Sequence, residues 1–146
     1  MKIGFDEHVS PRLIDALGII QKPGAATFVD FRKSYGELKG DAGLVRLFAA
    51  DGGHTMLSGD TNMPNVLPTV VAIQEAGLRA VFLPPAWCKA KRHPQTAFLI
   101  RWWPDILKLA AESEAGSGFV ISYHWTSFQA RPIQWRRQLG GPKHEE

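Results

Sequence analysis

Cysteine is almost absent from this sequence, and so are the long apolar runs typical of membrane proteins. Cys88 is the one cysteine among 146 residues, which excludes an internal disulfide and a zinc site built from several cysteines. No stretch reaches the roughly 18 consecutive apolar residues that a membrane-spanning helix requires. Residues 1–7 already contain two carboxylates, where a secretory signal would continue with an apolar stretch. We therefore expect a cytoplasmic protein.

Internal repeats and low-complexity tracts are also lacking, and the composition is that of a globular protein. Hydrophobic residues make up 45% of the chain and charged residues 21%, which is enough apolar side chain for a core. The length fits one domain. We expect a single domain over residues 1–140 and a disordered tail over residues 141–146.

Charge is divided unevenly along the chain. Residues 1–78 hold 7 basic and 9 acidic side chains, whereas residues 79–146 hold 10 basic and 5 acidic ones. This asymmetry is compatible with ordinary surface variation, or with a metal site beside a surface that binds a polyanion.

Extended and helical patterns alternate along the sequence. Apolar runs predict strands over six ranges: 3–5, 26–31, 54–58, 79–83, 119–125 and 130–137. Apolar residues at helical spacing predict helices from Pro11 (after an N-cap at Ser10) to Gly24, from Asp41 to Gly52, over 65–76, and over 95–114 with a bend or restart near Pro104. Residues 32–40 are polar and are expected to form a loop. This order predicts a three-layer α/β/α fold with a mainly parallel sheet and an antiparallel edge addition at the C-terminus.

Three aspartates fall where an open parallel sheet places its site, beyond the carboxyl ends of the strands. Asp6 ends the first predicted strand, Asp60 ends the third, and Asp41 begins the helix between them. Like charges gathered at one edge repel one another, and a bound cation is the simplest reason to keep them there. Carboxylates favour Mg²⁺ or Mn²⁺, which activate water and stabilise charge at a phosphodiester. Alternatively, Asp41 is only a helix cap, and Asp60 is only a turn residue or an N-cap before Pro64.

Three motifs together resemble those of PIN-like domains related to VapC toxins. They are KIGFDEHVSPRL at residues 2–13, GDAGLV at 40–45 and LSGDTN at 57–62, and with the predicted strands they cover about residues 1–85. The resemblance implies a metal-dependent ribonuclease, a hydrolase that is commonly the toxin of a toxin–antitoxin pair.

The same resemblance assigns roles to individual residues. It implies that Asp6, Asp41 and Asp60 are catalytic metal ligands for Mg²⁺ or Mn²⁺, that Glu7 assists catalysis, and that Asn62 contacts phosphate or water. It also implies RNA and an antitoxin protein as partners, and a homodimer as an option. Two departures stand out, because His8 occupies a position that often holds Asn and the second motif carries one acid where several are usual. These departures keep open a catalytically inactive binding module. A phosphoacceptor receiver domain is a third alternative, since such domains also carry acids after the first and third strands.

Basic and aromatic residues in the second half suggest how RNA is held. Lys89, Lys91, Arg92 and His93 follow the Pro84-Pro85 turn and are candidates for phosphate contacts, and Trp87 is a candidate for stacking a base. Alternatively, this is a solvated loop with Trp87 in the core.

Two further groups of aromatic and basic residues lie nearer the C-terminus. Arg131, Arg136 and Arg137 surround Trp135 in the last predicted strand, as an aggregation-resistant edge or as an edge that binds RNA or an antitoxin. Trp103 continues an apolar helical stripe, whereas Trp102 is expected to be exposed at an interface. Lys89 and Lys91 beside Cys88 favour a lowered thiol pKa, although no companion residues indicate nucleophilic catalysis.

Overall fold

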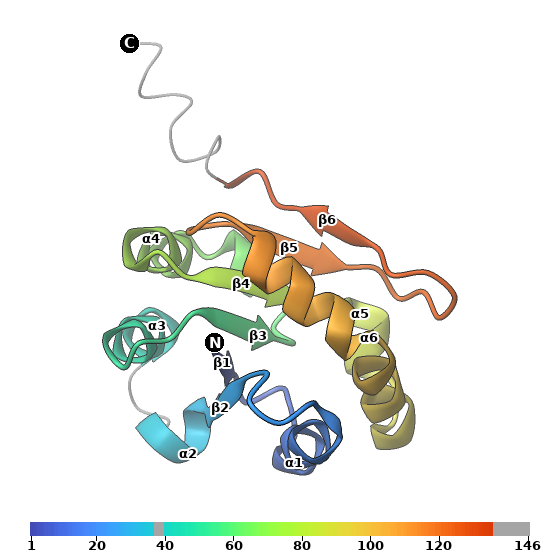
Figure 1. Ribbon diagram of the computed structural model, residues 1–146. Coiled ribbons are helices and arrows are strands. Elements are labelled where there is room, and N and C mark those ends of the chain that lie inside the picture. The colour runs from blue at the N-terminus through green and yellow to red at the C-terminus, as the bar shows by residue number, and fades with distance from the viewer. Residues whose placement is uncertain (37–39, 136–146) are drawn as a thin grey trace.

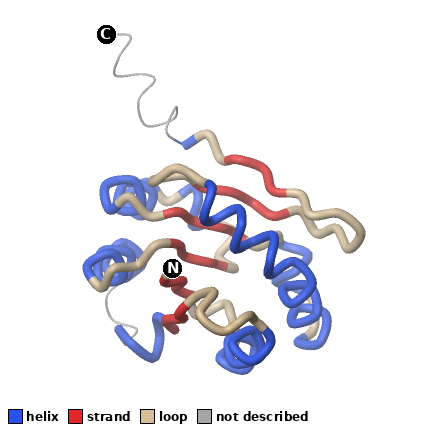
Figure 2. Tube along the Cα trace, in the orientation of Figure 1, coloured by secondary structure: helices blue, strands red, loops and turns tan. Residues whose placement is uncertain are grey.

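The protein is built around one six-stranded sheet. The computed structural model describes residues 1–36 and 40–135. The strand order is β2-β1-β3-β4-β5-β6, in which β1 to β5 run parallel and β6 is antiparallel to β5 (Figures 1 and 2). The strands are β1 (Lys2–Phe5), β2 (Thr27–Asp30), β3 (Thr55–Ser58), β4 (Arg79–Phe82), β5 (Gly118–Ile121) and β6 (Ala130–Pro132). The predicted fold class and the antiparallel addition are thus confirmed.

Helices lie on both faces of this sheet. Helices α1 and α6 pack together on one face, and α3 and α4 pack together on the other (Figure 1). The helical segments are α1 (Pro11–Ile20), α2 (Phe31–Tyr35), α3 (Gly40–Ala50), the 3-10 turn η1 (Met63–Asn65), α4 (Leu67–Ala76), α5 (Pro85–Lys89) and α6 (Arg92–Glu112). None of the helices within the described ranges is long and apolar enough to cross a membrane.

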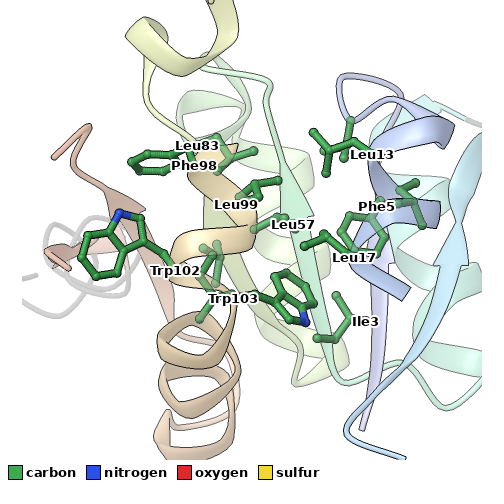
Figure 3. Close-up of a cluster of buried hydrophobic side chains, with 14 of the residues drawn as sticks. Ile3, Phe5, Leu13, Leu17, Leu57, Leu83, Phe98, Leu99, Trp102 and Trp103 are labelled. Atoms are coloured by element: carbon green, nitrogen blue, oxygen red, sulfur yellow. The ribbon is translucent and has the colours of Figure 1, made fainter. Parts of the chain in front are cut away.

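Successive side chains along the strands point to opposite faces of the sheet and contribute to two separate hydrophobic cores. On β1, Ile3 and Phe5 face the core beneath α1 and α6, which Figure 3 shows around Trp103 and Leu99. On the opposite face, Met56 of β3 joins the core beneath α3 and α4. This period of two is what a strand that is buried on both sides requires. Each helix pair is therefore fixed against the sheet.

Several element boundaries differ from those predicted. Helix α1 ends at Ile20 rather than at Gly24, because the chain turns at Gln21, whose backbone N–H still donates to Leu17 O. Residues predicted as a loop after the second strand include α2 instead. The Asp30 carboxylate accepts from the Arg32 N–H at 3.1 Å and caps that short helix.

The last helix and the last strand also differ from expectation. Helix α6 is one continuous element of 21 residues that contains Pro104 and begins three residues earlier than predicted. Strand β6 is only three residues long, and Trp135 lies beyond it. Trp135 is buried in the core beneath α3 and α4, and its Nε1 donates to Gly116 O at 3.0 Å. Arg131 is exposed on β6, while Arg136, Arg137 and the predicted tail at 141–146 lie outside the described residues.

Of the adjacent tryptophans Trp102 and Trp103, both are buried. Trp103 lies in the core, as its place in the apolar stripe predicts. The expectation that Trp102 is exposed is wrong, since only 8% of it is accessible. Its ring packs on Phe128 and its Nε1 donates to His124 O at 2.9 Å, so the chain that follows β5 covers it.

Candidate active site

One pocket at the carboxyl edge of the sheet collects the predicted acidic residues. Strands β1 and β3 are parallel neighbours, so the residues that follow them emerge side by side. The N-terminus of α3 reaches the same edge. The pocket is lined by Asp6, Glu7, His8, Arg32, Gly36, Gly40, Asp41, Leu44 and Asp60.

Asp6 is the buried centre of this pocket. The residue is 6% exposed, and its carboxylate accepts hydrogen bonds on both oxygens. Oδ1 accepts from the backbone N–H groups of His8 (3.0 Å) and Gly59 (3.4 Å), and Oδ2 accepts from the Ser58 hydroxyl and lies 3.3 Å from His8 Nδ1. A carboxylate offers about four lone-pair directions, so these contacts fix Asp6 in one orientation.

Asp60 is tied to Asp6 through Ser58. The buried Ser58 hydroxyl donates to Asp6 and accepts from the Asp60 backbone N–H at 3.0 Å. The Asp60 carboxylate in turn accepts from the Asn62 backbone N–H at 3.0 Å, which shapes the turn that leaves β3. Asp60 therefore does act as a turn residue while it also lines the pocket. Asn62 is exposed and is not one of the pocket-lining residues.

Asp41 shows the electrostatic consequence of this arrangement. It lies in the first turn of α3, which begins at Gly40, so it is not the cap of that helix. Its pKa is raised above the ordinary value, first by burial and then by the negative charges of Asp60, Asp6 and Glu7. The pocket thus places carboxylates close enough to disfavour one another's charge, as the sequence argument requires.

His8 occupies the exposed side of the same cluster. The pKa of its imidazole is raised, chiefly by the hydrogen bond with Asp6, while burial opposes the shift. The negative charges of Asp6, Asp60 and Glu7 add to the rise.

Two further residues, one in the lining of the pocket and one buried behind it, were not singled out from the sequence. Arg32 of α2 lines it, and its Nη2 donates to Glu7 O at 2.9 Å. Ser58, at the end of β3, links the two buried-side aspartates as described above. Ser58 ends β3 and Arg32 follows β2, so both lie at the carboxyl ends of strands, the same criterion that located Asp6 and Asp60. The criterion was not applied to Arg32, because residues 32–40 were predicted to form a loop.

The structure changes the interpretation of the segment after β4. Trp87 is fully buried, and its Nε1 donates to Gln95 O at 3.0 Å, so it is a core residue and does not stack a base. The pKa of Cys88 is raised rather than lowered, first by burial and then by the charge of Asp6. Its Sγ donates to Gly59 O at 3.0 Å. Lys89, Lys91 and Arg92 are exposed beside this edge but do not line the acidic pocket.

The comparison with protein families agrees with this geometry. The model of a family described as a PIN like domain matches residues 1–85, which contain every acidic residue of the pocket. The chain belongs to the PIN-like domain family. No curated protein and no solved structure matches it. The PIN-like match covers more than half of the chain and ends at the beginning of α5.

PIN-like domains are often nucleases, and a pocket rich in carboxylates has the donor chemistry that a divalent cation prefers. Its donor set is rich in carboxylate oxygen, and the mutual repulsion felt by Asp41 is the charge pattern that a cation relieves. Within residues 1–36 and 40–135, no three Asp, Glu, His or Cys side chains already stand close enough to ligate one ion together. Mg²⁺ commonly takes one or two carboxylates and keeps several waters. The carboxylate-rich lining of the pocket is therefore compatible in its donor chemistry with such a hydrated divalent cation.

Proposed function

We propose that this PIN-like protein is a metal-dependent endoribonuclease. The observation that carries the proposal is the convergence of Asp6, Asp41, Asp60 and Glu7 on one pocket at the carboxyl edge of the sheet. A metal-dependent hydrolase of phosphodiesters needs closely spaced carboxylates as ligands, whereas a purely structural turn does not.

The residues of the pocket divide the work in this proposal. Asp41 and Asp60 would hold Mg²⁺ or Mn²⁺ with their carboxylates, and the buried Asp6 would add negative charge at the same site. When bound, the ion activates the attacking water and stabilises the charge that develops on the phosphate and the leaving oxygen. Arg32, on the rim of the same pocket, balances the negative charge of the phosphate. Glu7 adds further negative charge at the entrance.

We also propose the biological setting that the VapC-like motifs imply. In that setting the protein is the toxin of a toxin–antitoxin pair, acts on cytoplasmic RNA, and is held inactive by a cognate antitoxin. The second acidic motif, residues 40–45, contains Asp41 as its one carboxylate, and this small number of ligands fits one divalent metal ion better than two.

The decisive experiment compares RNA cleavage by the wild type with that by Asp41→Asn and Asp60→Asn. Asp15→Asn is the matched control, because Asp15 is exposed on α1 and lies outside the pocket. We expect Mn²⁺-dependent cleavage that both pocket variants lose and the control keeps. Equal cleavage by all four proteins would refute the assignment of the site.

One observation favours a second candidate, a PIN-like module that binds without catalysis. The Asp6 carboxylate already accepts from three donor groups and lies 3.3 Å from His8 Nδ1, and the described part of the chain holds no preassembled set of three ligands. Calorimetric titration with Mn²⁺ separates the two candidates. Saturable binding that is lost in the triple Asp6→Asn, Asp41→Asn, Asp60→Asn variant supports the nuclease, and binding by neither protein supports the module. A receiver domain does not agree with the membership of the chain in the PIN-like family.

A further inference from the structure

Strand β2 forms one end of the sheet, and its outer side is open. Within the described residues, β1 is the strand that pairs with it, in a parallel register. The Thr27 N–H donates to Met1 O at 2.9 Å. Because alternate residues of such a strand bond to the neighbouring strand, the N–H and C=O groups of Phe28 point outward, away from β1. Backbone groups that point outward at an edge are a template for pairing with another chain.

A groove of about 620 Å³ runs along this open edge, where α1 and α2 flank β2 (Figure 1). It is lined by one face of α1, by Phe28 and Val29 of β2, and by the end of α2. Ile19 belongs to the lining and is 81% exposed, and the adjoining Ile20 is 62% exposed. These are the two most exposed large apolar side chains among the described residues. Apolar side chains that gather at an open edge mark a contact surface for a protein.

The two edge strands of the sheet differ in their protection against pairing. Strand β6, at the far end, carries Arg131 and Pro132, and charged residues and proline are usual means by which an edge strand avoids other chains. Strand β2 contains neither a cation nor a proline. Its one charged residue, Asp30, caps α2 with its carboxylate. Of these two edges, β2 is therefore the one whose sequence permits pairing.

The backbone of this edge is complementary to itself under a two-fold rotation. Two antiparallel β2 strands can exchange both hydrogen bonds between their Phe28 residues, because the N–H and C=O of each point outward. Gly18 of α1 lies over the same residue, since a Cβ on Gly18 would be 3.7 Å from Phe28 Cε2. The same two-fold axis therefore brings two α1 helices together, antiparallel, at Gly18 and Ile19. The distance between packed helices depends on the side chains at the contact, and a glycine there permits a close approach.

The charges along α1 match the same arrangement. Asp15 stands three residues before Gly18, and Lys22 stands three residues after Ile19, and both charged residues are exposed. In an antiparallel pair of α1 helices centred between Gly18 and Ile19, the Asp15 of each copy lies opposite the Lys22 of the other copy. A second copy of the chain thus supplies the opposite charge for both residues, which a partner of a single charge sign does not.

We propose that the groove along β2 is the interface of a two-fold dimer, in which antiparallel β2 strands join the sheets of two copies of this chain and the α1 helices pack together through Ile19. The same surface serves both copies, as a two-fold interface requires. Association removes Ile19 and Ile20 of each copy from water, and this burial is the main driving force. The proposal is independent of the proposed function, because the acidic pocket is lined entirely by residues of one chain.

Sedimentation velocity of the full chain tests the interface, at protein concentrations from about 1 to 100 µM. We expect the wild type to sediment with twice the chain mass of 16.2 kDa. Ile19→Lys should weaken the dimer by about 100-fold or more, because each dimer loses two apolar contacts. Leu67→Lys, at an exposed apolar position on α4, is the matched control and should leave the dimer intact. A wild type that stays monomeric, and so leaves the groove to a different protein, overturns the proposal, as does a dimer that Ile19→Lys does not weaken.

An exchange of charges tests the antiparallel orientation. Asp15→Lys and Lys22→Asp should each weaken the dimer by at least about 4-fold, because two symmetry-related pairs change from attraction to repulsion. The double variant should recover the dimer, since it restores both pairs with their signs exchanged. Both positions are exposed, so circular dichroism should show unchanged folding in all three variants. Two weakened single variants without recovery in the double variant would overturn the proposal.

The dimer and the proposed nuclease can fail separately. Ile19→Lys should cleave RNA like the wild type, because Ile19 lies outside the acidic pocket. Dimers that do not cleave RNA would count against the proposed function and leave the interface standing. Cleavage that depends on Asp60, by a protein that remains monomeric, would refute the interface alone.

Discussion

Gly4 of β1 is packed tightly against two aromatic rings, and replacing it by alanine should destabilise the protein. An added Cβ would lie 2.7 Å from Phe31 Cζ and 3.0 Å from Phe48 Cε1, and closer still to Phe31 Cε1. Both rings are buried, at 2% and 0% exposure, so neither can move into solvent. Overpacking of this kind costs about 1–3 kcal/mol. We expect the free energy of unfolding to fall by that amount and the melting temperature by roughly 3–10 °C.

A second glycine provides a matched control for this substitution. Gly18 lies inside α1, and an added Cβ there would meet nothing closer than Phe28 Cε2 at 3.7 Å. Alanine is favoured over glycine in a helix interior, so Gly18→Ala should raise the free energy of unfolding by about 0.5–1 kcal/mol. Urea denaturation followed by circular dichroism measures both variants. If Gly4→Ala matches the wild type or exceeds it, Phe31 does not pack on β1 as described.

The Gly4 substitution also tests how the pocket is built. Phe31 begins α2, and the next residue, Arg32, reaches the pocket. Displacing Phe31 should therefore move Arg32 and weaken RNA binding more than the loss of stability alone explains. Fluorescence anisotropy with a labelled RNA oligonucleotide in EDTA, carried out well below the melting temperature of the variant, measures this effect. Unchanged RNA binding would show that the position of Arg32 does not depend on the packing of Phe31.

Three further predictions follow from the hydrogen bonds and pKa shifts of the pocket. Ser58→Ala should lower the free energy of unfolding by about 1.5–3 kcal/mol in urea denaturation, because the buried hydroxyl donates to a charged carboxylate, while Ser34→Ala, at an exposed position, should change little. The pKa of His8 is raised mainly by its hydrogen bond with Asp6, so protonation of His8 stabilises the fold at low pH, and this contribution is lost as the pH rises through the raised pKa. Asp6→Asn should therefore lower the His8 pKa in an NMR titration, and an unchanged pKa would contradict the hydrogen bond. The raised pKa of Cys88 predicts slower alkylation by iodoacetamide at neutral pH than in the urea-unfolded chain, and equal rates would show a thiol that is neither buried nor near negative charge.

Local patterns in the sequence predicted most of the elements and the acidic pocket. The apolar runs located β1, β3 and β4, and the helical spacing located α1, α3 and α4, because burial on one or both faces requires those periods. The convergence of Asp6, Asp41 and Asp60 followed from parallel strands ending at one edge. The antiparallel β5–β6 pair was also anticipated.

Packing between distant segments decided what the sequence left open. Four tryptophans are buried and one is exposed, and nothing in the residues adjoining Trp87, Trp102 or Trp125 distinguishes them. Trp102 is covered because a loop more than twenty residues later folds over it, and Trp87 because α6 returns across it and Gln95 accepts its N–H. Arg32 lines the pocket because it lies on the short helix α2, which was not predicted since residues 32–40 are polar and were expected to form a loop.

The sequence by itself determined the alternation of strands and helices, the edge at which the carboxylates gather and the charge of each half of the chain. These properties depend on periodicity and on the type of residue at the end of each strand. The tertiary structure alone decided how Asp6 is held, which aromatic ring faces solvent and which cation enters the pocket. Whether a side chain is buried depends on which other segments cover it, and this is decided only when segments far apart in the sequence have packed together.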